Sequence, residues 1–173
     1  GGNGNIGTAI VARAKPDGYT LLMQYSAYHS ANPALIKDLN WKPDDFVGVA
    51  MGAVAPHVIV IARRVPADDL KSFIAYAKAN PSKLNYASFG TGTTSHLNGE
   101  RLKRVAGIDI VHVPYKGSGD AMKDHLSGVA QLFFDGPTTA ISNARGGKVK
   151  MLATATGARL AALPDLPTMK EAG

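Results

Sequence analysis

The fold is decided by residues 84–96, LNYASFGTGTTSH. The apolar run from Leu84 to Phe89 predicts a strand, and a helical pattern begins a few residues later. Between the two, Gly90 and Gly92 allow the backbone to approach a bound molecule closely. A strand, a glycine turn and a helix in this order are the building unit of α/β folds.

The same alternation continues on both sides of this segment. The chain reads as a helix that opens at 66–68 and stops at 80–81, strand 84–89, helix 93–106, strand 108–114, helix 118–126, strand 130–134, helix 137–145 and strand 150–156. Strands that alternate with helices predict a parallel-rich sheet with helices on both faces. Ligands of such sheets bind at the carboxyl ends of the strands, here the turns after Phe89, Pro114 and Phe134.

The first third of the chain has a weaker pattern. We expect a helix over 8–14, a strand over 18–24, a short helix near 34–37, and strands over 47–54 and 58–62. These elements precede the regular alternation and do not extend it.

Composition excludes several classes of protein. The chain has 173 residues, a net charge of +6, 45% hydrophobic residues and no cysteine. The hydrophobic fraction excludes disorder, and the absence of cysteine excludes disulfides, thiolate zinc sites and a cysteine nucleophile. The longest apolar run, 46–62, is broken by Pro56 and is too short for a membrane span. The scattered basic residues and the single Trp do not indicate nucleic-acid binding.

The opening residues contain a dinucleotide-like motif. Gly2 to Gly7 reads G-N-G-N-I-G and matches G-x-G-x-x-G. The segment lacks a preceding strand and an acidic residue about 20 positions later, both of which a dinucleotide site requires. A turn that leads into a helix explains the glycines as well, and a dinucleotide-binding enzyme remains the alternative function.

The turn after the strand 84–89 is the strongest candidate for a binding site. Thr93, Thr94 and Ser95 place three hydroxyl groups where a helix begins, beside backbone N–H groups that have no helical partner. Such a group of donors suits an anion. The alternative is that Thr93 or Thr94 only caps the helix.

Two further turns carry polar candidates. Tyr115, Lys116 and Gly117 follow one strand, where Lys116 can equally be an ordinary exposed residue. Asp135 follows the next strand, and either binds a polar group of a ligand or caps the helix begun by Pro137. His96 is either a carboxylate-binding or a structural histidine.

Catalytic machinery is not evident. The five histidines have no metal-binding spacing, and no G-x-S-x-G elbow is present. The pairs Asp44-Asp45 and Asp68-Asp69 precede helical patterns, where N-caps are expected. We therefore predict no catalytic residue, no metal and no cofactor.

Several motifs in one order resemble a known family. They are Gly2 to Leu22, Ala77 to Pro81 with Leu84 to Leu97, Val113 to Gly119, and Leu163 to Thr168 with Glu171 to Gly173. Together they are similar to the Bug family, the periplasmic solute-binding receptors of tripartite tricarboxylate transporters. The resemblance implies a two-lobed type II periplasmic binding protein (Venus flytrap) that binds a small organic carboxylate, is not an enzyme, and passes its ligand to membrane permease subunits.

The resemblance also implies a domain organisation and a site. The chain would be a fragment that lacks N- and C-terminal parts of the receptor. Residues 1–62 would be part of lobe one with a crossover strand at 58–62, 63–150 would be lobe two, and 151–173 would be the return crossover and the start of the C-terminal part of lobe one. The full-length protein would carry a signal peptide, lie in the periplasm and be a monomer. The ligand-binding loops would fall on Tyr25, Ser26, Ala27, Gly90, Thr91, Gly92, Thr93, Thr94, Ser95, His96, Tyr115, Lys116, Gly117 and Asp135. Tyr25 and Tyr28 stand where relatives often have small residues, which would narrow the pocket or favour a flat ligand.

Overall fold

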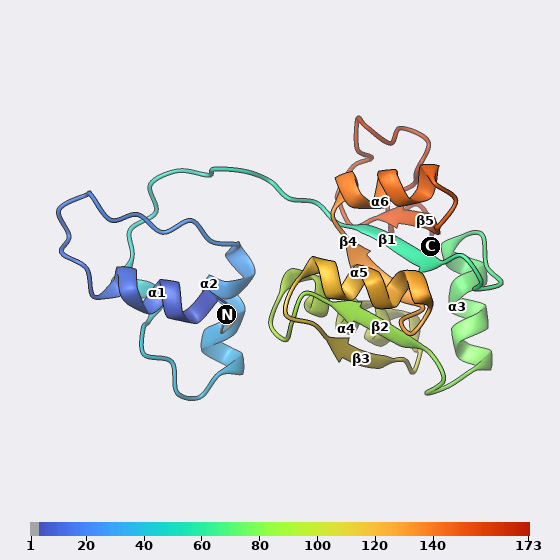
Figure 1. Ribbon diagram of the computed structural model, residues 1–173, viewed down its shortest axis with the longest axis horizontal. Coiled ribbons are helices and arrows are strands. Elements are labelled where there is room, and N and C mark those ends of the chain that lie inside the picture. The colour runs from blue at the N-terminus through green and yellow to red at the C-terminus, as the bar shows by residue number, and fades with distance from the viewer. Residues whose placement is uncertain (1–3) are drawn as a thin grey trace. The chain divides into compact units, whose positions relative to one another are not determined.

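The computed structural model describes residues 4–173, and these form two compact units (Figure 1). One unit comprises the described residues up to Val54 together with Thr91–Thr94. The other comprises Ala55–Gly90 and Ser95–Gly173. We call them the first and the second unit and describe each by itself.

A five-stranded sheet forms the centre of the second unit. Its strands are β1 (Val58–Ala62), β2 (Asn85–Ser88), β3 (Val111–Pro114), β4 (Leu132–Asp135) and β5 (Val149–Thr154), in the order β3-β2-β4-β1-β5. The strand β2 is parallel to β3 and β4, whereas β1 is antiparallel to β4 and β5. The prediction of a parallel-rich α/β sheet is confirmed, with β1 as the one antiparallel strand of this sheet.

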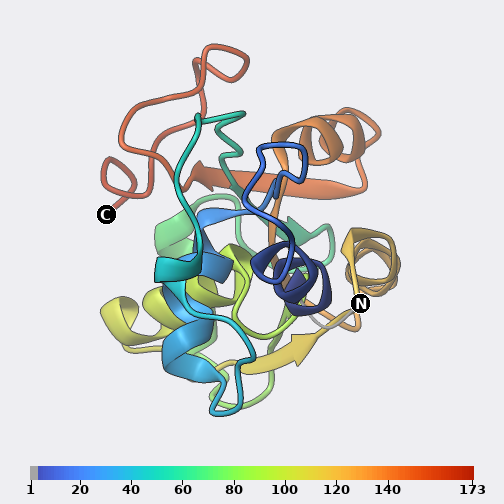
Figure 2. The same cartoon turned by 90° about the vertical axis from the view of Figure 1, so that its left-hand side faces the viewer.

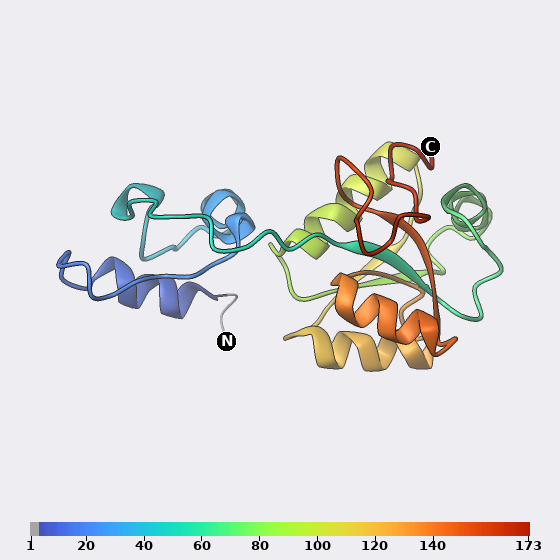
Figure 3. The same ribbon diagram turned by 90° about the horizontal axis from the view of Figure 1, so that it is seen from above.

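Helices cover both faces of this sheet (Figure 3). They are α3 (Leu70–Ala79), α4 (Thr94–Ala106), α5 (Ser118–Ser127) and α6 (Pro137–Arg145). Because successive side chains of a strand point to opposite faces, Ile59 and Ile61 of β1 join a core with α3 and α4. Val58 and Val60 join a second core that includes Ala121 of α5 and Ala140 of α6.

Local sequence signals explain the ends of these helices. Asp69 precedes α3, and its carboxylate Oδ1 accepts the N–H of Ser72 at 2.7 Å. Gly128 ends α5 with a φ of 80°, in the left-handed region that glycine adopts at low cost. Pro137 is the first residue of α6, where its missing N–H is not needed. Of these signals, the sequence prediction uses the pair Asp68-Asp69 and Pro137, but not Gly128.

The first unit contains α1 (Asn5–Ala12), α2 (Ser26–Leu35) and a short 3-10 helix, η2 (Pro43–Asp45). Asn5 joins two parts of it: its Oδ1 accepts N–H groups from Asn32 Nδ2 at 3.0 Å and from Trp41 Nε1 at 3.2 Å. The ring of Trp41 also stacks on His29, with centroids 5.8 Å apart. Figure 2 shows the two helices of this unit, in dark and lighter blue, joined by irregular chain.

Three predictions for the first unit are wrong. No strand forms over 18–24 or 47–54, because neither segment has a strand beside it to complete a ladder among the described residues. The helix expected near 34–37 instead begins at Ser26 and ends at Leu35, with Pro33 in its last turn.

The assignment of residues 1–62, 63–150 and 151–173 to receptor lobes stays a prediction. In the structure β1 and β5 both belong to the second unit, and residues after β5 also pack there. Thr154 forms a bridge with Thr168, and the N–H of Thr154 donates to the carbonyl of Pro167 at 2.8 Å. Among residues 4–173, no helix is long and apolar enough to cross a membrane.

Candidate functional site

The turns predicted to bind ligand follow β2, β3 and β4, which are neighbours in the sheet. Since the three strands run parallel, their carboxyl ends meet at one edge. The structure therefore brings the ends of these strands together within the second unit, with Tyr115, Lys116, Gly117 and Asp135 directly after or at them.

The turn after β2 is held by two buried serines. Ser88 Oγ accepts the N–H of Gly90 at 3.1 Å, and Ser95 Oγ accepts the N–H of Phe89 at 3.2 Å. Gly90 has a φ of 128°, which a residue with a Cβ rarely adopts. The predicted ligand-binding residue Ser95 thus has a structural hydrogen bond as well, and its buried hydroxyl fixes the start of α4.

Residues 91–94 belong to the first unit and lie against α2. Gly92 has a φ of 83°, and a Cβ built on it would lie 2.9 Å from Oδ1 of Asn32. Asn32 is fully buried, and its Oδ1 has no hydrogen-bond partner among residues 4–173. The orientation of the Asn32 amide is fixed, because its Nδ2 donates to Asn5 Oδ1, the oxygen that also accepts the indole N–H of Trp41. Of the hydroxyl residues here, Thr93 is buried and Thr94 is the first residue of α4.

The turn after β3 presents three candidates of different character. Tyr115 donates its hydroxyl to Asp124 Oδ2 at 2.8 Å. Burial and then this hydrogen bond raise the pKa of Tyr115 to about 12, so the phenol stays neutral. Lys116 is exposed, and Gly117 precedes the first residue of α5. The contact with Asp124 therefore fixes the ring of Tyr115 against α5, the helix that follows this turn. Lys116 is the cation of the turn.

Asp135 is almost completely buried at the end of β4. Its Oδ2 accepts the hydroxyl of Thr139 at 2.5 Å. Burial raises the pKa of Asp135, while the hydrogen bonds from Thr139 and the Gly136 backbone lower it. The carboxylate thus contacts the Thr139 side chain in the first turn of α6, but the N-cap residue of this helix is Gly136 and no side-chain cap is present.

His96 belongs to a cluster that the sequence did not indicate. Its ring stacks on His112 of β3, with centroids 4.2 Å apart, and His112 stacks on Tyr86 of β2 at 4.8 Å. Nε2 of His112 lies 2.7 Å from Ser88 Oγ. Sequence reasoning missed Ser88 and His112, and the only available signal was a polar residue within each of two apolar strands.

The candidates Tyr25, Ser26 and Ala27 lie in the first unit. Tyr25 is the N-cap residue of α2, and Ser26 and Ala27 open the helix. Tyr25 lies edge-on to Tyr28, with ring centroids 6.3 Å apart. Burial, and then the proximity of Tyr25, raise the pKa of Tyr28.

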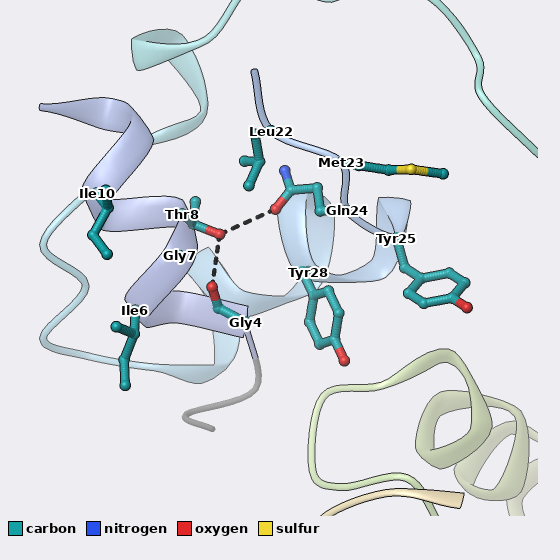
Figure 4. A pocket seen from close by; sticks show the side chains of 10 residues that line it. All are labelled: Gly4, Ile6, Gly7, Thr8, Ile10, Leu22, Met23, Gln24, Tyr25 and Tyr28. Carbon is teal, nitrogen blue, oxygen red and sulfur yellow. Dashed lines mark hydrogen bonds between the residues drawn. The ribbon is translucent and has the colours of Figure 1, made fainter. Parts of the chain in front are cut away.

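Tyr25 and Tyr28 help to line a pocket of about 530 Å³ in this unit (Figure 4). The other lining residues are Gly4, Ile6, Gly7, Thr8, Ile10, Leu22, Met23 and Gln24. None of these described residues carries a charge, and the Thr8 hydroxyl already bonds Gly4 O and Gln24 Oε1, at 3.0 and 3.2 Å. The pocket therefore suits an apolar group better than a carboxylate.

The glycine motif of residues 2–7 lies partly outside the described residues. The described part begins with Gly4, the N-cap residue of α1, which has a φ of 79°. Among residues 4–173, no group of histidine and acidic residues has an arrangement that would hold a metal ion.

All of residues 1–173 match the family described as "Tripartite tricarboxylate transporter family receptor". The chain belongs to this receptor family. The curated relative BugT of Bordetella pertussis is 34% identical over 175 residues, which cover 100% of this chain and 54% of BugT. The chain spans about half the length of the curated relatives it matches over its whole length. The predicted resemblance to the Bug family is confirmed.

Solved structures of the receptor family share the fold. A structure described as a periplasmic transporter is 40% identical with a TM-score of 0.90, covering 99% of this chain and 58% of that one. Rpa4515 of R. palustris, solved with adipate, is 32% identical with a TM-score of 0.91, covering 98% and 57%. MatC of Rhodopseudomonas palustris, solved with bound malate, is 33% identical with a TM-score of 0.87, covering 100% and 59%. The predicted periplasmic-binding-protein fold is thereby confirmed.

The receptor family also decides between the two functions left open by the sequence. Its match includes residues 2–7, so the glycine motif is part of a solute-receptor sequence and not a dinucleotide fingerprint. Two of the solved relatives were determined with adipate and with malate, and the family is one of receptors.

Proposed function

We propose that this chain is part of a periplasmic receptor that binds a small organic carboxylate and delivers it to the membrane permease subunits of a tripartite tricarboxylate transporter. The observation that carries the proposal is the family match over the whole chain. Two relatives solved with adipate and malate support a dicarboxylate as the ligand. The receptor performs no catalysis, and the full-length protein is a periplasmic monomer.

Within the receptor, Thr93, Thr94 and Ser95 bind one carboxylate group at the N-terminus of α4. Three properties support this assignment. The first helical turn offers N–H groups without intrahelical acceptors, the helix dipole favours negative charge, and the hydroxyls add donors. The glycines at 90 and 92 give this turn its unusual backbone course.

The remaining predicted site residues have further roles in the proposal. Tyr115, Lys116 and Gly117 flank the carboxylate, with Lys116 as the cation, and Asp135 selects a polar substituent. His96 contributes a ring N–H. Gly90, Thr91 and Gly92 contribute backbone groups, and Tyr25, Ser26 and Ala27 contribute from α2.

Thr94 gives the clearest test of the site. Thr94→Ala in the full-length protein removes one hydroxyl donor, whereas Ser95→Ala would also break the hydrogen bond from Phe89. We expect binding of the ligand, identified from a panel including malate and adipate, to weaken about tenfold, or ~1.4 kcal/mol, as for a lost hydrogen bond to a charge. Isothermal titration calorimetry measures the change.

Thr94→Ser is the matched control, because it keeps the hydroxyl and removes only a methyl group. It should bind within about twofold of the wild type. Equal affinity of the alanine variant would place the carboxylate elsewhere. A thermal shift with NAD or FAD and with no carboxylate would contradict the proposed function itself, because a ligand at 100 times its dissociation constant adds about 2.7 kcal/mol of stability.

A further inference from the structure

The turn that follows β2 rests on a stack of three rings. Tyr86 and His112 are directly opposite each other on β2 and β3, and their rings are 4.8 Å apart with an interplanar angle of 23°. His96, in the first turns of α4, covers the other side of His112 at 4.2 Å and 27°. The ring of His112 is thus held between one neighbouring strand and the helix that begins at the proposed site.

Ser88 connects this stack to the turn. Its fully buried Oγ accepts the N–H of Gly90 at 3.1 Å and lies 2.7 Å from Nε2 of His112. A buried hydroxyl also needs an acceptor for its own proton. Among the described contacts of Ser88 Oγ, Nε2 of His112 is the acceptor available. The ring of His112 is therefore neutral and carries its proton on Nδ1.

Protonation of His112 would disrupt this arrangement. With a second proton, Nε2 would become a donor, and the Ser88 hydroxyl would lose its acceptor. The Ser88 Oγ affected is the atom that accepts the N–H of Gly90. Burial lowers the pKa of His112 to about 4, and the neighbouring charge of His96 also lowers it, so the ring is neutral at physiological pH. The hydrogen bonding of Ser88 that holds the turn at Gly90 therefore depends on the protonation state of His112.

The groups that face the two histidines come from β2 and α4. Tyr86 of β2 donates its hydroxyl to Glu100 of α4 at 2.7 Å, and Lys103 of α4 lies 3.1 Å from the same carboxylate oxygen. Burial lowers the pKa of His96, the charge of Glu100 raises it, and the charge of Lys103 lowers it. Two imidazoles in a 4.2 Å stack do not both accept a proton readily, since like charges repel.

We propose that His112 is a positioning residue of the carboxylate site: as a neutral ring it holds Ser88 and the turn at Gly90, and it leaves His96 as the member of the pair that takes up a proton when a carboxylate binds. This inference rests on the proposed function. A bound carboxylate near His96 stabilises the imidazolium, so binding and proton uptake are coupled. The ligand then binds more tightly as the pH falls from 8 toward 6.

The test uses the full-length protein with malate and adipate as probes. Calorimetry in two buffers of different ionisation enthalpy gives the number of protons taken up per ligand. We expect uptake of a fraction of one proton between pH 6 and 7 for the wild type, and none for His96→Gln. Equal uptake by both proteins would overturn the role of His96.

Two substitutions separate the functions of His112. His112→Phe keeps a ring in the stack and removes the acceptor of Ser88, and we expect at least tenfold weaker binding. His112→Gln places an amide oxygen near the position of Nε2, and we expect it to recover most of the affinity. Wild-type affinity in His112→Phe, in a protein that unfolds at the wild-type temperature, would overturn the positioning role.

A measurement on the wild type does not depend on whether the variants fold. The ¹⁵N chemical shifts of the His112 ring distinguish the two neutral tautomers, and we expect the form with the proton on Nδ1. The other tautomer would overturn the proposed anchor. If the wild type binds neither malate, adipate nor any other carboxylate, the proposed function fails, whereas binding without proton uptake contradicts only this inference.

Discussion

At the scale of single residues, His125 shows how burial alone sets a charge state. It is fully buried on α5, its Nδ1 lies 3.0 Å from the carbonyl of Ala130, and its Nε2 has no hydrogen-bond partner in the described part of the chain. Burial lowers the pKa of His125 from 6.5 to about 4, and the hydrogen bond to Ala130 opposes this shift. The folded state therefore holds this ring neutral, with its proton on Nδ1.

The consequence is a defined loss of stability in acid. Between pH 6.5 and 4 the unfolded chain binds a proton at His125 that the folded chain does not, so stability falls as the pH falls. The contribution is roughly 3 kcal/mol over this range. In His125→Asn, which keeps a donor for Ala130, urea unfolding from pH 7 to 4 should show a pH dependence smaller by that amount.

The other histidines do not affect the difference in pH dependence between the wild type and His125→Asn. Burial also lowers the pKa of His57 and His112, but both are present in the variant and in the wild type. An unchanged pH dependence in His125→Asn would mean that His125 is protonated in the folded state.

At the scale of elements, α4 approaches the sheet closely because it carries a glycine. A Cβ built on Gly99 would lie 2.2 Å from the ring of Tyr86, which is fully buried and bonded to Glu100. Helix propensity alone favours alanine over glycine by about 1 kcal/mol. Overpacking of a rigid core typically costs 1–3 kcal/mol, or about 2 kcal/mol in the middle of that range. The cost of the clash with Tyr86 is therefore larger than the gain in helix propensity.

Gly99→Ala should therefore destabilise the protein by about 1 kcal/mol or more. Gly7→Ala in α1 is the matched control: apart from its own helix backbone and chain neighbours, no described atom lies within 4 Å of its Cβ position, so we expect no loss and a small gain in stability. Denaturant midpoints for the two variants measure both effects. A stabilised Gly99→Ala protein would show that Tyr86 moves aside at little cost.

The elements also show which predictions the sequence supports. The helix α6 matches its prediction residue for residue, because Pro137 and Gly146 mark its ends locally. The strand expected over 18–24 does not form, because a strand exists only beside a partner, and no partner is encoded in its own residues. The start of α2 was missed because Tyr25 offers no side-chain cap.

The same limit applies to the site. Glycines and hydroxyl residues revealed the turn after β2, since their conformational and hydrogen-bonding properties are local. The contact of Ser88 with His112 depends on the register of β2 against β3, which pairs Tyr86 with His112 and Ser88 with Pro114. Register between strands separated by a helix is not encoded in either strand alone.

At the scale of the whole molecule, the first unit has an apolar surface that a soluble chain rarely exposes. Tyr19, Leu21 and Met23 are exposed, as are Val47, Val49 and Met51. The two segments lie close together, since the methyl group of Met23 is 3.4 Å from the Cβ position of Gly52. Alternating apolar residues on an extended segment with free edges favour association with other chains.

Expressed as it stands, the chain should therefore self-associate through this surface. Val49→Lys should shift it toward the monomer in light scattering and size-exclusion chromatography. Val105→Lys is the control, because Val105 is similarly exposed but lies on α4 in the second unit. The same degree of association in both variants would exclude the 47–51 segment as the contact.

The position of β1 in the sheet has a consequence for the synthesis of this protein. All five residues of β1 are buried. The strands on either side of β1 come much later in the chain, since Ile61 pairs with Leu132 and Val58 with Thr154. A ribosome must translate through Thr154 before β1 has both neighbours. Until then the nascent chain carries a five-residue apolar strand that lacks one or both neighbours, so the sheet closes late and the strand is exposed to premature contacts.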